Sequence, residues 1–197
     1  MGKPEILSQA LRLFLEKGYD GASMSDIAAA VGIQKASLYA HYTGKEEIFS
    51  AVFSDVLEEY RRLISSFTAR QEGEHALVQL ERIFREFLLY CLQSAKMHFW
   101  DRFFYYSPEF IRERMARETG KTQQEFLRMI EQIITQGIEQ GEIRRQPVEG
   151  AALAYYYLMI GLSMSVSLYE RGALERDIAL TWNGLSKGLT SNNTMGE

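Results

Sequence analysis

The chain has 197 residues, of which 46% are hydrophobic and 24% charged, with a formal net charge of −4. This composition is typical of a globular protein with one sizeable core or two small domains. The negative charge excludes a polycation, so any binding of nucleic acid must depend on a local basic surface. Cys91 is the only cysteine, which excludes an internal disulfide, and we expect it to be a core residue. Because residues 1–17 contain no apolar signal segment, we expect a cytoplasmic protein.

Helical periodicity runs along the whole chain and predicts an all-α fold of about nine to ten helices. The first helix is expected over residues 4–17, with Gly18 at its end. Ser23 and Asp26 have the spacing of a capping box, which predicts a second helix that stops at Gly32. Further helices are expected over 34–41, 45–70, 76–92, 96–106, from 108 to an interruption at Gly120, 122–140, 147–169 and 173–189. We expect a polar joint over 71–75 and a disordered polar tail over 190–197.

Residues 23–45 are the most informative about function. The small apolar residues that would form the inner face of two packed short helices are Ile27, Ala28, Val31, Ile33 and Leu38. No acidic residue lies between Asp26 and Glu46. The basic and aromatic residues of that interval are Lys35, Tyr39, His41, Tyr42 and Lys45. Two short helices joined by a glycine turn, with a basic and aromatic surface, are the layout of a helix-turn-helix, whose second helix enters the DNA major groove.

This pattern resembles the N-terminal domain of TetR/AcrR-family transcriptional regulators. The resemblance lies in the series Phe14-x-x-x-Gly-Tyr19, in residues 23–42 and in the Lys-Glu-Glu-Ile-Phe segment at 45–49, and it covers about residues 5–52. It implies a DNA-binding domain over 1–46 and a helical domain for effector binding and dimerisation over 47–197. It also implies a homodimeric repressor that binds a palindromic operator, dimerises through its last two helices and is released by a small hydrophobic or aromatic effector. The competing interpretation, a plain helical corner, does not require the basic and aromatic series.

Residue types in the motif suit different contacts with DNA. Gln34 can pair with adenine, Lys35 can reach guanine or phosphate, and the Ala36 methyl group can meet a thymine methyl group. Tyr39 and Lys45 suit phosphate contacts, Lys45 because it stands at a helix N-terminus. The predicted DNA contacts are Ser23, Ser25, Gln34, Lys35, Ala36, Ser37, Tyr39, His41 and Lys45.

Four of these positions carry alternatives or departures from the family pattern. Ser23 also suits a helix cap, and His41 equally suits packing against the first helix. The family often has Ser where Gln34 stands and Gly where Ala36 stands, so the operator preference of relatives does not transfer to this chain. We expect no basic N-terminal arm that reaches the minor groove.

The aromatic stretch at 96–106 admits two interpretations. Aromatic residues at helical spacing usually pack in a core, whereas the family resemblance implies the wall of an effector cavity, with the helix at 147–169 opposite. The predicted effector contacts are Phe99, Trp100, Phe103, Phe104, Tyr156 and Met159. A cavity at Phe99, Trp100 or Phe103 would favour the effector, and a packed interior would favour a DNA-binding dimer without one. Asp101 and Glu86 suit a cationic ligand, but we expect both to be exposed.

The sequence disfavours two other classes of protein, membrane proteins and enzymes. Residues 150–169 carry no charge over 20 positions, which is long enough to span a membrane, but four tyrosines and three serines favour a dimer interface and no membrane contact. The metal-like spacing Glu72-x-x-His75 lies in the polar joint, and three histidines with one cysteine leave no credible catalytic triad. We therefore expect no enzyme, no metal and no cofactor.

Overall fold

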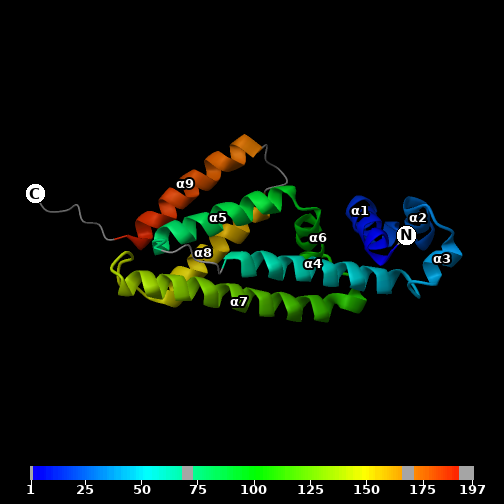
Figure 1. Cartoon of the computed structure of the whole chain (residues 1–197), viewed down its shortest axis with the longest axis horizontal. Helices are drawn as coiled ribbons and strands as arrows, with labels where there is room; N and C mark the ends of the chain where they lie inside the picture. Colours follow the sequence, from blue (N-terminus) through cyan, green and yellow to red (C-terminus); the bar gives the residue numbers. More distant parts are fainter. Residues whose placement is uncertain (1, 68–72, 166–170, 191–197) are drawn as a thin grey trace, which may run out of the picture. The chain divides into compact units, whose positions relative to one another are not determined.

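A computed structural model describes residues 2–67, 73–165 and 171–190, which form helices and no strand in these ranges (Figure 1). The helices are α1 (Lys3–Gly21), α2 (Met24–Val31), α3 (Lys35–Tyr39), α4 (Lys45–Phe67), α5 (Ala76–Gln93), α6 (Ala95–Tyr105), the 3-10 helix η1 (Glu109–Ile111), α7 (Arg112–Glu139), α8 (Val148–Ser163) and α9 (Arg171–Leu189). The predicted all-α class and the predicted number of helices are confirmed.

The contacts within the chain define two compact units. Unit 1 consists of Met1–Arg62 and Ser94–Gly120, and unit 2 consists of Leu63–Gln93 and Lys121–Glu197. The helices α4 and α7 each contribute to both units. These units follow contacts rather than function, so the predicted division after residue 46 stays a prediction.

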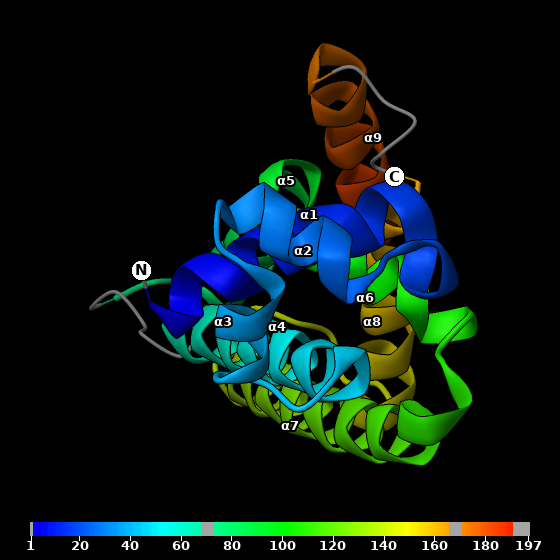
Figure 2. The ribbon, with the colours of Figure 1, turned by 90° about the vertical axis from the view of Figure 1, so that its right-hand side faces the viewer.

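Glycines set the path of the chain at the start of unit 1, where α1, α2 and α3 pack together (Figure 2). Gly18 has φ +74° and ψ 175°, which breaks the regular turn of α1 where the sequence predicted its end. Gly32 has φ +76°, a left-handed conformation that a residue with a Cβ atom rarely adopts. The N–H of Gly32 donates to the carbonyl of Ala29 at 3.1 Å and that of Ile33 to Ala28 at 3.0 Å, which closes α2 and turns the chain into α3.

An aromatic cluster forms the core of unit 1. The ring of Phe49 on α4 lies 5.0 Å from Phe14 on α1, and 5.1 and 4.9 Å from Phe99 and Phe103 on α6. All four side chains are buried. Aromatic pairs at these separations add to the stability gained from burial alone. The cluster therefore joins α6 to the helices that carry the N-terminal motif.

The helix α7 is continuous where the sequence predicted an interruption. Gly120 was predicted to interrupt a helix, but α7 runs without a break from Arg112 to Glu139. A glycine within a helix costs only about 1 kcal/mol relative to alanine, and the buried side chains of Met115, Thr122 and Phe126 lie on both sides of Gly120. Packing of this stripe outweighs the local preference of one residue.

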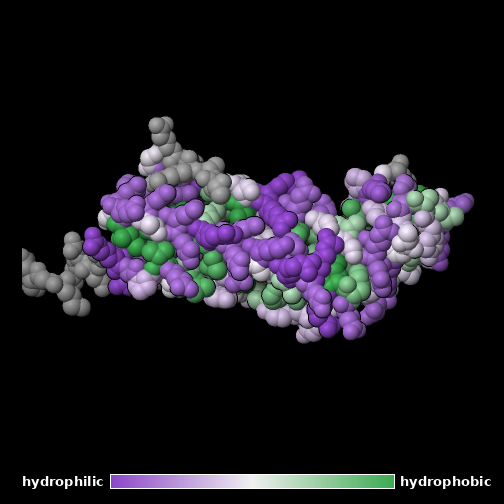
Figure 3. All heavy atoms as spheres, turned by 90° about the horizontal axis from the view of Figure 1, so that it is seen from below, coloured by the Kyte–Doolittle hydropathy of each residue, from purple (hydrophilic) through white to green (hydrophobic). Residues whose placement is uncertain are grey.

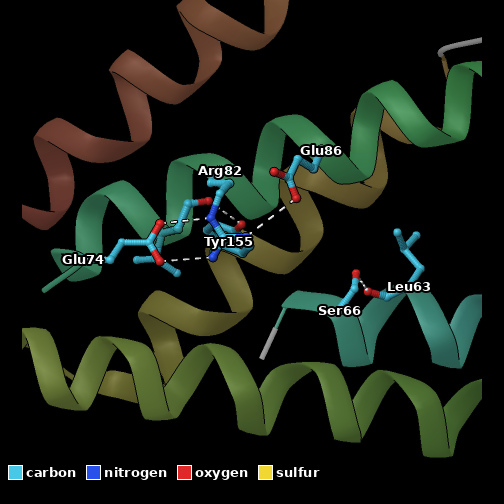
Figure 4. A network of polar contacts seen from close by, with 7 residues as sticks. Leu63, Ser66, Glu74, Arg82, Glu86 and Tyr155 are labelled. Atoms are coloured by element: carbon cyan, nitrogen blue, oxygen red, sulfur yellow. Dashed lines mark hydrogen bonds and ion pairs between the residues drawn. The ribbon is translucent and has the colours of Figure 1, made fainter. Parts of the chain in front are cut away.

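Unit 2 contains a buried polar contact between α5 and α8 (Figure 4). The Tyr155 hydroxyl donates to the carbonyl of Leu80 at 2.8 Å, and burial raises the pKa of Tyr155 well above its ordinary value while nearby Arg82 opposes the shift. The Arg82 guanidinium donates to Glu74 at 2.9 and 3.1 Å. Cys91 is buried on the same helix α5, as expected of a core residue.

The C-terminal helices differ in length from the prediction. The helix α8 ends at Ser163, whereas a helix over 147–169 was expected; residues 166–169 lie outside the described residues. Residues 71 and 72 of the predicted joint and 191–197 of the predicted tail also lie outside them. In the described part of the chain, no helix has both the length and the apolar character needed to cross a membrane. The face drawn in Figure 3 mixes hydrophilic residues with separate patches of hydrophobic ones.

Candidate DNA interface

A capping box begins α2, as the sequence predicted. The Ser23 hydroxyl accepts a hydrogen bond from the Asp26 N–H at 3.1 Å, and the Asp26 carboxylate accepts one from the Ser23 N–H at 3.0 Å. Lys17 on α1 donates to the same carboxylate at 2.7 Å. Hydrogen bonds to the Asp26 carboxylate, first from Lys17 and then from the hydroxyl and the N–H of Ser23, lower the pKa of Asp26 to about 2. The second helix is thereby fixed both at its own end and against α1.

The inner face of the motif is closely packed. The side chains of Ile27, Ala28, Val31 and Leu38 are buried, as predicted, whereas that of Ile33 is only half-buried. Ala28 must be small because α2 crosses its neighbours there, and Leu38 from α3 has no exposed surface. The recognition element is therefore held rigidly, although α3 has only five residues.

The outer face of α3 is free of acidic residues and exposed. Gln34 is the N-cap of α3, but only its carbonyl takes part, accepting from the N–H of Ser37 at 2.9 Å, and its amide makes no capping bond. The exposed residues of this face are Gln34, Lys35, Ala36, Ser37, Tyr39 and His41. The Lys35 ammonium lies 6.0 Å from the centre of the Tyr39 ring. Side-chain amide, ammonium and phenol groups thus stand together on the surface that a helix-turn-helix presents to DNA.

His41 had two predicted alternatives, a phosphate contact and packing against α1. His41 is exposed, which favours a phosphate contact over packing against α1. That packing position belongs to Tyr42, which is buried, with the Lys3 ammonium 5.5 Å from its ring centre. Lys3 was not among the predicted contacts, because its position beside the end of α3 depends on how α1 folds back and not on local spacing. Ser25 is exposed in the first turn of α2, and Ser23 is exposed although it serves as the cap.

Lys45 at the start of α4 is already engaged within the protein. Its ammonium donates to the Tyr19 carbonyl at 2.7 Å and lies 4.2 Å from the centre of the Tyr19 ring. The cation–π contact and the hydrogen bond fix the position of the charge at the end of α1. A charge fixed in this way loses less side-chain entropy when a phosphate binds, so the arrangement supports the predicted phosphate contact.

The predicted effector residues of α6 lie in unit 1, and most of them pack in its interior. Phe99 and Phe103 belong to the aromatic cluster, with ring centres 4.6 Å apart. Trp100 stacks on Tyr60 of α4 at 5.3 Å. Phe103 also lines a groove of about 720 Å³, whereas Phe99 and Trp100 do not. Phe104 is exposed.

The other two predicted effector residues lie in unit 2. Tyr156 is buried, with its ring centre 5.7 Å from that of Phe126, and Met159 is also buried. The expectation that Asp101 is exposed was wrong, because its carboxyl group is largely buried and this burial raises its pKa to about 6. Glu86 is exposed, as expected, and lies 3.6 Å from Arg82 (Figure 4). The described residues contain no cluster of His, Cys, Asp and Glu that could hold a metal ion.

The N-terminal part of the chain matches known proteins closely. Residues 6–52 match the sequence model of the family described as "Bacterial regulatory proteins, tetR family". The biofilm operon icaADBC HTH-type negative transcriptional regulator IcaR of Staphylococcus epidermidis is 55% identical over 47 residues, which are 24% of this chain and 25% of that protein. The IcaR of Staphylococcus aureus is 51% identical over the same length. The chain thus matches only about a quarter of the length of these curated relatives.

Solved structures match nearly the whole chain in fold. A TetR transcriptional regulator from Chloroflexus aurantiacus has a TM-score of 0.75 and 24% identity, covering 95% of both chains. FadR from Bacillus subtilis in complex with stearoyl-CoA has a TM-score of 0.67 and 18% identity, covering 95% of this chain and 100% of that one. Residues 6–52 thus match the DNA-binding segment of TetR-family regulators, and nearly the whole chain shares the fold of solved TetR/AcrR-family regulators.

Proposed function

We propose that the protein is a homodimeric, cytoplasmic transcriptional repressor that binds a palindromic operator and is released by a small hydrophobic or aromatic effector. The observation that carries the proposal is the exposed, acid-free face of α3 on a closely packed helix-turn-helix. The local character of this surface matters because the chain as a whole has a net charge of −4. The predicted contacts with DNA are the residues of this face together with Ser23, Ser25 and Lys45.

One helix-turn-helix buries too little surface for tight, specific binding, so a second copy is required. Dimerisation through α8 and α9 would supply it. Large apolar side chains are exposed on this pair of helices and on the turn after α8, namely Tyr157, Met164 and Leu180. Burial of such side chains against a second copy would remove them from water and stabilise the dimer.

The effector is expected in the helical domain, and two observations bear on its chemistry. The predicted contacts Tyr156 and Met159 of unit 2 offer aromatic and thioether surfaces that suit an apolar molecule. FadR, which shares the fold, was solved with stearoyl-CoA, so long-chain acyl-CoA esters belong in a first screen. An effector acts as a release signal only if it binds the DNA-incompetent state more tightly than the DNA-bound state.

The experiment is selection of binding sites from random DNA with the purified protein, followed by affinity measurements over a range of salt concentrations. Lys45→Ala should weaken binding to all sequences about equally and lower the slope of log K against log salt by about 1, because one phosphate contact is lost. Gln34→Ala should instead relax the preference at one base position.

A matched control is Arg62→Ala. Arg62 is an exposed basic residue on α4, the helix that begins with Lys45, but lies 17 positions along it, roughly 25 Å from the interface. It should leave both the affinity and the salt slope unchanged. Failure to select any site from random DNA would refute the proposal, and equal losses on specific and random DNA for Gln34→Ala would exclude base reading by that residue.

A second candidate is a DNA-binding dimer whose helical domain serves dimerisation or a protein partner and takes no effector. The packing of Phe99 and Trp100 against Phe49 and Tyr60 favours this second candidate, whereas the groove lined by Phe103 favours an effector. A screen of acyl-CoA esters and aromatic molecules for release of the selected DNA separates the two candidates. Release by any of these molecules would reject the second.

A further inference from the structure

Unit 1 contains a groove that shares only Phe103 with the predicted effector contacts. It has a volume of about 720 Å³ and is lined by the end of α1, the start of α4, the end of α6 and the segment through η1. This volume lies within the range of sites for small organic ligands. Except for Phe103, the residues that line it are different from the predicted effector contacts.

Carboxylates dominate the charge of the groove. Asp20, Glu46 and Glu109 line it, and among the described residues none of the three takes part in an ion pair. The one basic residue in the lining is Arg102, whose guanidinium donates to the Leu15 carbonyl. The three acidic groups outnumber the Arg102 guanidinium in the lining and the Lys45 ammonium beside Tyr19, and this excess of negative charge favours a cation and opposes an anion.

The pKa of the Tyr19 phenol is raised in part by the negative charges of the groove. Burial, then the charge of Glu46, then that of Asp20 raise this pKa above its ordinary value. Both carboxylates therefore act on one ring at the wall of the groove.

Aromatic rings complete the lining. Tyr106 is 84% exposed and Phe110 is 40% exposed, which is unusual for two large rings that lie beside carboxylates. The ring of Phe110 lies 5.4 Å from that of Tyr19, so these two surfaces are continuous. Exposed aromatic faces with nearby carboxylates are the features that recognise organic ammonium ions, through cation–π contacts and charge attraction.

We propose that this groove binds an organic cation, a quaternary or aromatic ammonium ion, through the carboxylates of Asp20, Glu46 and Glu109 and the rings of Tyr106 and Phe110. The rings would contact the apolar groups around the nitrogen, and the carboxylates would offset its positive charge. The site shares Phe103 with the predicted effector contacts and borders Lys45, which precedes Glu46 in the chain.

The test is isothermal titration calorimetry of the full-length protein, without DNA, with benzyltrimethylammonium as the probe. Benzyl alcohol and benzoate present the same ring with no charge and with a negative charge. We expect binding of benzyltrimethylammonium only. Each of the substitutions Glu46→Gln and Glu109→Gln should weaken it about fivefold, the upper end for partly exposed ion pairs.

The matched control is Glu58→Gln, which removes an exposed carboxylate from α4 twelve positions beyond Glu46 and should leave the affinity unchanged. Circular dichroism of each variant shows that it is folded. The proposal is overturned if benzyltrimethylammonium does not bind, if benzyl alcohol or benzoate binds equally well, or if the double variant Glu46→Gln/Glu109→Gln binds like the wild type. Since the titration contains no DNA, its failure and the failure of the proposed function are distinguished.

Discussion

The same substitution at two glycines of α7 should have opposite effects on stability. Gly120 and Gly137 both lie inside this helix with negative φ, so alanine is compatible with the backbone at each position. A Cβ atom added at Gly120 meets no atom within 4 Å. One added at Gly137 meets the Ala76 Cβ atom at 2.8 Å and the Ile143 Cδ1 atom at 2.7 Å. The surroundings alone therefore distinguish the two variants.

The magnitudes follow from two terms. Alanine is favoured over glycine in a helix by roughly 0.5–1 kcal/mol, and Gly120→Ala should gain this amount in full. Gly137→Ala gains the same term but overpacks the contact with α5 and with the turn after α7, which costs roughly 1–3 kcal/mol. Ile143 can rotate away, but Ala76 has no rotamer to change, so the cost persists. We expect Gly137→Ala to be less stable than Gly120→Ala by about 1–3 kcal/mol.

The measurement is urea unfolding followed by circular dichroism, at one protein concentration because association changes apparent stability. The difference between the two variants cancels the helix-propensity term, which leaves the contact with Ala76 and Ile143 as its source. If Gly137→Ala proves as stable as Gly120→Ala, the close approach of α5 to α7 at this point is refuted.

Two further predictions concern a buried charge and the dimer. Because burial raises the pKa of Asp101 to about 6, its ionised form destabilises the fold above that pH, and this cost disappears as the pH falls below the unfolded value near 4. Asp101→Asn should thus stabilise the protein by roughly 1–3 kcal/mol at pH 7.5 and by much less at pH 4.5 in urea unfolding; an equal gain at both would contradict the burial. Leu180→Glu should yield monomers in sedimentation velocity. Val78→Glu is the control, because Val78 is 54% exposed and Leu180 58%, and it should leave dimers. Dimers in both variants would exclude α9 from the interface.

The N-terminal motif could be predicted from the sequence because local interactions determine it. Ser23 and Asp26 are three residues apart and cap one another, and Gly32 closes α2 through its own conformation. The buried positions Ala28 and Leu38 followed from helical periodicity, which packing preserves. Each of these features requires only knowledge of the neighbouring residues.

Features that depend on distant residues were missed. The carbonyl that accepts from Lys45 belongs to Tyr19, 26 residues earlier in the chain. The burial of Asp101 depends on how α6 packs, and its charge alone favoured the surface. Gly120 stays helical because a buried stripe on both sides holds α7 together. Sequence periodicity shows which face of a helix is buried but not which residues of other helices cover it.

The aromatic cluster around Phe49 limits how this DNA-binding domain can be exchanged between relatives. The segment that matches the family ends at residue 52, which makes that position a natural junction for chimeric regulators. A junction there would carry Phe14 and Phe49 into the new protein but leave Phe99 and Phe103 behind, although all four rings share one core. The transferable module is therefore discontinuous in sequence: a graft that keeps its core needs α6 as well as the first 52 residues.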